Sequence, residues 1–135
     1  MALRIVQLGS PRAAGEGVRL GTVRRPPRGV PKSEFAKRDF YDVWLPNLSP
    51  SAALVAGALK VPSGKEGDKD WAVFRRRFTA EMNQPDASRV LDLLAALSHQ
   101  TSFSLGCYCD DERRCHRAVL RELLQARSAA IEGAP

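Results

Sequence analysis

Apolar residues gather in four short stretches whose composition predicts β-strands, over residues 4–9, 18–23, 41–46 and 102–109. The last stretch shows the period of two that a strand imposes. One side of it would carry Phe103, Leu105, Cys107 and Cys109. The residues on its other side are mostly small, so both faces suit a strand buried inside a sheet.

Other apolar positions recur every three or four residues and predict amphipathic helices over residues 71–82, 88–100 and 115–129. A further helix is expected after Ser49, a good N-cap residue, with Pro50 at the first helical position. A short polar helix is expected over residues 33–39, with Ser33 as its N-cap.

The predicted order is three strands, three helices, a fourth strand and a last helix, which favours a single α/β domain over residues 1–129. We expect a mostly parallel sheet flanked by helices, a small Rossmann-like three-layer arrangement. A polar, glycine-containing loop is expected at residues 62–70, and residues 130–135 are predicted to be a loose tail.

The composition also indicates the cellular location of the protein. The chain has 135 residues, of which 44% are hydrophobic and 27% charged, as is usual for soluble globular proteins. Its longest apolar stretches are too short to span a bilayer, and its first residues do not resemble a signal peptide. Three clustered cysteines are unlike a secreted disulfide framework. We therefore expect a cytoplasmic protein without a membrane partner.

The net charge of +6 is unevenly distributed. Residues 1–38 hold nine lysines and arginines against two acids, whereas the rest of the chain is close to neutral. Such an excess fits a phosphate-bearing partner, either a small molecule or a nucleic acid. A basic face that only keeps the protein in solution fits equally well, because net charge alone is not specific.

Three segments together resemble a known bacterial family: GTVRRPPRG (21–29), YDVWLPNLSPS (41–51) and LGCYCDDERRCHRAVLRELL (105–124). They are similar to the domain of unknown function 488 family, and in particular to its YeaO-like group, over about residues 17–125. The resemblance implies a small intracellular α/β domain and supplies no reaction, cofactor or catalytic residue. In the first segment only Pro27, Arg28 and Gly29 follow the family pattern, and the family's acid and tryptophan are missing.

Two of these segments are loops that follow predicted strands, RRPPRG (24–29) and CDDERRCHR (109–117). If the strands are parallel, both loops lie at the same edge of the sheet, where α/β proteins bind ligands beside helix N-termini. We expect Arg25, Arg28 and Arg117 to bind a phosphate group there, because the guanidinium group pairs with phosphate in a bidentate manner.

The acids of the second loop have two interpretations. Asp110 and Asp111 either cap the last helix, or one of them pairs with an arginine of the other loop or acts as a general base with His116.

A thiol-dependent enzyme or redox sensor is the alternative function. Cys109 would lie at the end of a strand and Cys115 at the start of a helix, where amide groups and nearby arginines stabilise a thiolate. His116 is a further candidate catalytic residue, and its other interpretation is a hydrogen bond at the start of the last helix. A third alternative is a protein-interaction module in which the Cys-His-Arg block is only structural.

Metal binding is disfavoured on spacing alone. Cys107 and Cys109 lack the two to four intervening residues of a zinc knuckle. Cys115 and His116 are adjacent in a helix and point about 100° apart. We therefore predict no metal and no other cofactor, and the sequence leaves the oligomeric state open.

Overall fold

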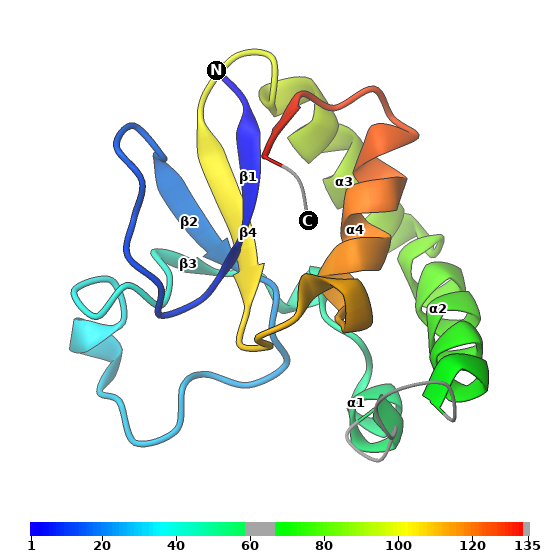
Figure 1. Ribbon diagram of the computed structural model, residues 1–135. Coiled ribbons are helices and arrows are strands. Elements are labelled where there is room, and N and C mark those ends of the chain that lie inside the picture. Colours follow the sequence, from blue (N-terminus) through cyan, green and yellow to red (C-terminus); the bar gives the residue numbers. More distant parts are fainter. Residues whose placement is uncertain (59–66, 134–135) are drawn as a thin grey trace.

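The computed structural model describes residues 1–58 and 67–133. Its five strands form one parallel sheet in the order β3-β2-β4-β1-β5 (Figure 1). The strands are β1 (Leu3–Gln7), β2 (Val18–Gly21), β3 (Val43–Trp44), β4 (Phe103–Cys107) and β5 (Ile131–Glu132). The predicted fold class, a small α/β domain with a parallel sheet packed against helices, is confirmed.

Strand β4 is the centre of the sheet. It pairs with β1 on one side, where Leu3 faces Phe103, and with β2 on the other, where Leu20 faces Leu105. All five residues of β4 are buried, as its small and apolar residues on both sides predicted. The third predicted strand, residues 41–46, contributes only the two residues of β3 at the edge.

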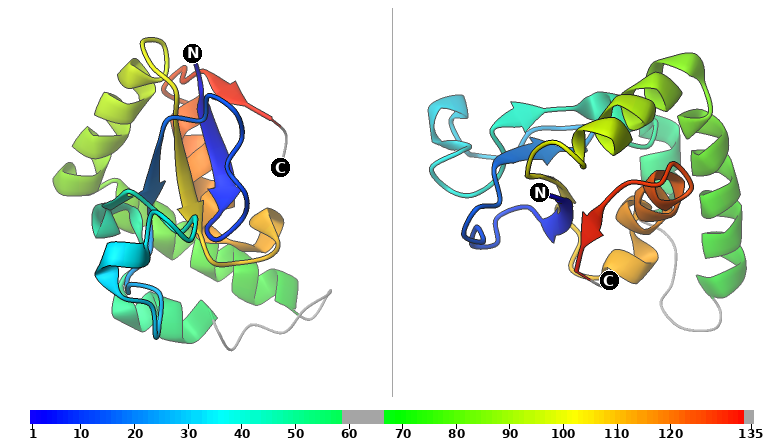
Figure 2. Two further views of the ribbon diagram at one scale, coloured as in Figure 1. Left: turned by 90° about the vertical axis from the view of Figure 1, so that its left-hand side faces the viewer. Right: turned by 90° about the horizontal axis from the view of Figure 1, so that it is seen from above.

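Four α-helices cover one face of the sheet (Figure 2). They are α1 (Ala52–Ala58), α2 (Asp68–Met82), α3 (Pro85–Leu97) and α4 (His116–Gln125). The apolar stripes of α2, α3 and α4 meet Phe103 and Leu105 of β4 in the main core, which also contains Phe78, Leu91 and Leu120. Burial of these apolar side chains is the main force that holds the helices on the sheet.

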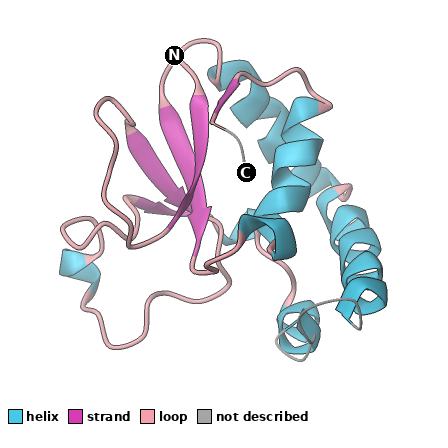
Figure 3. Cartoon of the chain, in the orientation of Figure 1, coloured by secondary structure: helices cyan, strands magenta, loops and turns pink. Residues whose placement is uncertain are grey.

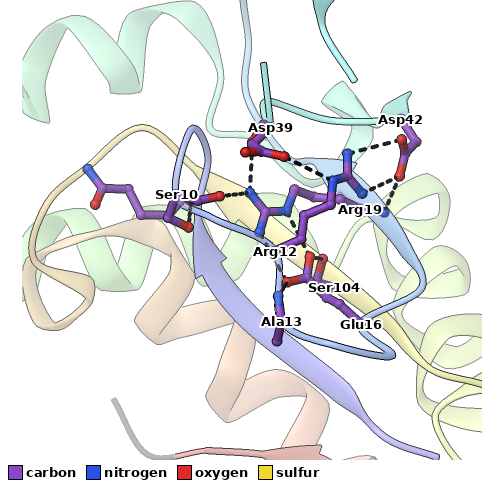
Figure 4. Close-up of polar contacts among 9 residues, drawn as sticks. Ser10, Arg12, Ala13, Glu16, Arg19, Asp39, Asp42 and Ser104 are labelled. Carbon is purple, nitrogen blue, oxygen red and sulfur yellow. Dashed lines mark hydrogen bonds and ion pairs between the residues drawn. The ribbon is translucent and has the colours of Figure 1, made fainter. Parts of the chain in front are cut away.

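In the part of the chain that the structure describes, connecting segments and no α-helix lie over the other face of the sheet (Figure 2). The three-residue 3-10 helix η1 (Lys32–Glu34) belongs to this layer. Beneath it Arg19 of β2 is completely buried and donates two hydrogen bonds to Glu16 and one each to the carbonyl groups of Ser10 and Asp39 (Figure 4). A buried polar network thus joins the loop after β1, strand β2 and the segment before β3.

Several predicted boundaries are wrong at the N-terminal ends of helices. The residue that caps α1 is Ser51 and not Ser49, since the Ser51 hydroxyl accepts from the amide of Leu54 at 3.3 Å. Ser49 instead follows the 3-10 helix η2 (Pro46–Leu48) and donates its hydroxyl to the Pro46 carbonyl. The helix expected over residues 33–39 shortens to η1, where Pro31 and not Ser33 precedes the first turn.

Two expectations about loops also change. The C-terminal residues Ile131 and Glu132 form β5 and pair with Leu3 and Arg4 of β1, so this part of the chain is not a loose tail. Of the loop expected at residues 62–70, residues 68–70 already belong to α2, and residues 62–66 lie outside the described residues. Along residues 1–58 and 67–133, no helix combines the length and the apolar character needed to cross a membrane.

Candidate functional site

The loops after β2 and β4 leave the sheet at the same edge, because these two strands are parallel neighbours (Figure 3). The hydroxyl of Thr22, directly after β2, donates to the carbonyl of Gly106 in β4 at 2.9 Å. Further out, the hydroxyl of Tyr108 donates to the carbonyl of Arg25 at 2.9 Å. The expected juxtaposition of the RRPPRG and CDDERRCHR loops is therefore present.

Three cysteine side chains converge at this edge. Cys107 is the last residue of β4, Cys109 lies in the bend that follows, and Cys115 directly precedes α4. Their sulfur atoms all lie within 4.8 Å of one another, and those of Cys107 and Cys115 are 2.7 Å apart. Cys107 and Cys115 are 1% and 2% exposed, whereas Cys109 is exposed to solvent. The site therefore has one accessible sulfur atom with two buried ones behind it.

This convergence corrects the prediction that Cys107 and Cys109 lie on one side of a single strand. Strand β4 ends at Cys107, and the chain bends at the next residues. Cys109 lies outside the strand, so the alternation of the strand does not set the direction of its side chain. Its sulfur lies close to that of Cys115, which belongs to another element.

The start of α4 is capped by a thiol and not by the acids that precede it. The Cys115 sulfur accepts from the amide of Arg117 at 3.5 Å. Asp111 caps a different element, the 3-10 helix η4 (Glu112–Arg114), by accepting from the amide of Arg113 at 3.0 Å. The positive end of the α4 dipole therefore faces the cysteine cluster, where it favours negative charge.

His116 lies behind the cluster in a fixed tautomer. Its Nε2 is 2.7 Å from the carbonyl oxygen of Thr22, and because a carbonyl only accepts, the proton is on Nε2. Its Nδ1 is therefore unprotonated, and it lies 3.7 Å from the Cys115 sulfur. Burial lowers the pKa of His116 to about 4, against a weaker opposing effect of the Thr22 carbonyl. At neutral pH the ring is a neutral proton acceptor directed at Cys115.

Arg117 places a buried positive charge beside the thiols. The residue is 3% exposed, and its Nη2 donates to the carbonyl of Cys109 at 2.6 Å. Its Nε has no hydrogen-bond partner, and it makes no ion pair with a carboxylate of residues 1–58 or 67–133. A buried cation without a counter-ion is costly. A thiolate in the cluster would supply the missing negative charge.

The arrangement favours a negative charge on the Cys109 sulfur. The neighbouring Cys107 and Cys115 thiols lower the pKa of Cys109 far below its ordinary value, and the positive charge of Arg117 adds to the effect. The same contact with Cys109 raises the pKa of Cys107, which stays protonated. The direction of these shifts favours a thiolate at Cys109, the exposed sulfur of the three.

The residues expected to bind phosphate are only partly brought together. Arg25 and Arg28 are exposed, and neither forms an ion pair with a residue that the structure describes. Arg117 is buried and does not join them at the surface. Asp110 accepts a hydrogen bond from the Gln7 side chain at 2.9 Å. Neither Asp110 nor Asp111 forms an ion pair with an arginine of the RRPPRG loop.

Sequence reasoning left three residues out of the site. The prediction places Cys107 inside a strand over residues 102–109, whereas β4 ends at Cys107, beside the neighbouring loop. Thr22, which orients His116, was visible only as a polar residue closing an apolar strand. Gln7, which binds the carbonyl of Tyr108 and the carboxylate of Asp110, gave no signal of its own.

One of three comparisons with known proteins identifies the family, and none indicates the activity. No curated protein and no solved structure is significantly similar to the chain. Residues 3–128, nearly its whole length, match the family model described as the active DUF488-N3 subclade. The resemblance noted in the Cys-His-Arg block and the RRPPRG loop is therefore confirmed, and the chain belongs to the DUF488 family.

Proposed function

We propose that the protein is a thiol-dependent enzyme with Cys109 as its nucleophile. The observation that carries this proposal is the convergence of three sulfur atoms, one of them exposed, beside a buried arginine that pairs with no carboxylate among the described residues. The thiolate is the nucleophilic form of cysteine. A site that stabilises it at an accessible position is suited to covalent catalysis.

The other residues have distinct parts in this proposal. The thiols of Cys107 and Cys115 lie within 4.8 Å of the Cys109 sulfur and lower its pKa. Arg117 fixes the backbone at Cys109 and supplies the compensating charge. His116, held by Thr22, is a proton acceptor for Cys115 and thus acts on Cys109 through a neighbour. In the reaction the Cys109 sulfur attacks an electrophilic atom of the substrate, and the bond to the leaving group breaks as the new bond forms.

Three free thiols in contact require a reducing environment, since oxidation would join any two of them. The proposed location is therefore the cytoplasm.

The experiment is alkylation of the native, reduced protein by iodoacetamide at pH 7 in the presence of a chelator, with mass-spectrometric mapping of the label. We expect Cys109 to be alkylated first and alone. A Cys109→Ser variant should then lose nearly all rapid labelling while keeping its circular dichroism spectrum. Equal labelling of all three cysteines, or none, would contradict the proposal.

A second candidate function is the binding of a phosphate-bearing ligand, a nucleotide or a nucleic acid. The specific observation is that Arg25 and Arg28 are exposed on the loop that Tyr108 attaches to the end of β4. Exposed Lys32, Lys37 and Arg38 continue the positive charge along the next segment. A phosphate group bound there would lie at the same edge of the sheet as Cys109, so this candidate is compatible with the first.

Retention on a phosphate-bearing column tests this second candidate. Arg28→Ala should elute at lower salt than the wild-type protein, because a phosphate contact is lost. The matched control is Arg76→Ala, which removes an equally exposed arginine from α2 on another part of the surface. An equal shift for both variants would mean that retention reflects net charge alone.

A further inference from the structure

We infer that the sulfur atoms of Cys107, Cys109 and Cys115 also form a binding site for one thiophilic metal ion of the Zn²⁺ class. The inference goes beyond the proposed function, because it needs no substrate and no reaction. It uses the same three residues in their deprotonated forms.

The distances between the three sulfur atoms are close to those of a metal site. With zinc–sulfur bonds of about 2.3 Å, two sulfur ligands of a tetrahedral ion lie about 3.8 Å apart. The three sulfur atoms here already lie within 4.8 Å of one another. To bind one ion together, Cys107 and Cys115 would have to separate from 2.7 Å by about 1 Å.

The Cys-x-Cys spacing, which disfavours a metal site within one extended strand, does not prevent one in this fold. A Cys-x-Cys pair within one extended strand cannot close on an ion, but β4 ends at Cys107 and the chain bends before Cys109. Cys115 comes from a separate element, the N-terminus of α4. His116, next to it in sequence, is engaged with Thr22 and lies outside the group of three sulfur atoms. The site therefore has three ligands from two segments.

The charges around the three sulfur atoms also favour a bound cation. Three thiolates around a divalent ion carry a net charge of −1, and Arg117 supplies one buried positive charge that is paired with no carboxylate among the described residues. The N-terminus of α4 adds a favourable dipole. The ion with its ligands and Arg117 would thus be close to neutral, which limits the cost of burying it.

The exposure of Cys109 leaves one coordination position open to solvent. Three protein ligands with an open fourth position are typical of zinc sites that hold water or a substrate. Bound metal would also occupy the thiolate that the proposed function uses as a nucleophile. Metal binding and alkylation of Cys109 should therefore exclude each other.

The test is a titration of the reduced, metal-free, full-length protein with Co²⁺ under anaerobic conditions. We expect thiolate-to-cobalt charge-transfer absorption that saturates at one equivalent and disappears when Zn²⁺ is added. Because the ligands must lose their protons, the apparent affinity should rise with pH. Arg117→Met, which removes the compensating charge from the surroundings of the ligands, should weaken binding by about 10- to 100-fold.

The decisive variant is Cys109→Ser, since this residue is exposed and its replacement leaves the buried core intact. It should lose part of the charge-transfer absorption and bind Co²⁺ at least about tenfold more weakly. His99→Gln is the matched control, because it removes the exposed histidine far from the cluster and should change nothing.

Absence of the charge-transfer band in protein with three titratable thiols would overturn the inference. An unchanged band in Cys109→Ser would overturn it as well. The proposed function is tested separately, by labelling in the presence of a chelator. Selective labelling without cobalt binding would refute only the metal site, and cobalt binding without selective labelling would refute only the catalytic thiol.

Discussion

The buried ion pair of Glu16 and Arg19 makes a quantitative prediction about stability. Both side chains are almost completely buried, and Arg19 Nε and Nη2 donate to the two carboxylate oxygens at 2.8 and 3.0 Å (Figure 4). Ser104 of β4 and the amide of Ala13 also donate to this carboxylate. Replacing Glu16 by glutamine keeps the shape of the side chain and removes its charge.

The magnitude follows from the pKa of Glu16. Burial alone would raise this pKa, but hydrogen bonds from Arg19, Ser104 and Ala13 outweigh burial and lower it from 4.5 to about 2. At about 1.4 kcal/mol per pKa unit, the ionised form stabilises the folded state by about 3 kcal/mol. Because the folded-state pKa is the lower one, this contribution is complete above pH 4.5 and is lost as the pH falls towards 2.

Glu16→Gln should therefore lower the free energy of unfolding at pH 7 by about 3–5 kcal/mol, since it leaves the Arg19 guanidinium buried without a counter-ion. The assay is urea denaturation at pH 7 and again at pH 3. The difference between variant and wild type should shrink at pH 3, because Glu16 is then largely protonated in the unfolded chain but still ionised in the folded protein, so that folding has to release a proton. Glu34→Gln, at a partly exposed acid without an ion-pair partner among the described residues, is the matched control.

A loss below about 1 kcal/mol at pH 7, or a difference that is the same at pH 7 and pH 3, would refute the reasoning. If Glu16→Gln does not fold, the double variant with Arg19→Met keeps the test open. Replacing both charges by neutral side chains of similar volume should recover most of the lost stability. No recovery in the double variant would equally contradict the account.

Two further predictions concern loops at the two ends of the sheet. Gly17→Ala should lower the melting temperature strongly, because the backbone there has φ +80 and a Cβ would lie 2.0 Å from the Ser102 carbonyl oxygen, whereas Gly15→Ala, with φ +72 but open space, should cost only about 1 kcal/mol. A similar cost for both variants would show that the close approach is unimportant. Tyr108→Phe removes the hydrogen bond to Arg25 and should speed amide hydrogen exchange over residues 24–29 but not in β1, with unchanged exchange contradicting the role of Tyr108.

The fold was predictable from local patterns because the elements concerned are strongly periodic. Phe103 and Leu105 alternate as a strand requires, and Phe74 and Phe78 repeat as a helix requires. The shared edge of the RRPPRG and CDDERRCHR loops followed from the geometry of parallel strands. Helix starts were less certain, since Ser49 and Ser51 are equally good caps and only tertiary packing chooses between them.

The cysteine cluster was not predictable, because it depends on where a strand ends. A strand that continued to Cys109 would have kept its sulfur away from Cys115, and the sequence does not encode that boundary locally. The pairing of Glu16 with Arg19 was equally hidden, since charged residues are normally expected at the surface. Both depend on contacts between segments that are distant in the sequence.

The central claim is that Cys109 is a thiolate at neutral pH, and the pH dependence of its alkylation rate tests this most directly. The rate should be measured with iodoacetamide in chelator and reductant from pH 4 to pH 10, with Cys109 followed by mass spectrometry. The account predicts a rate that has already reached its plateau at pH 7, since the Cys107 and Cys115 thiols and the Arg117 charge lower the pKa of Cys109. An inflection near pH 8.5, the value of an ordinary thiol, would contradict it.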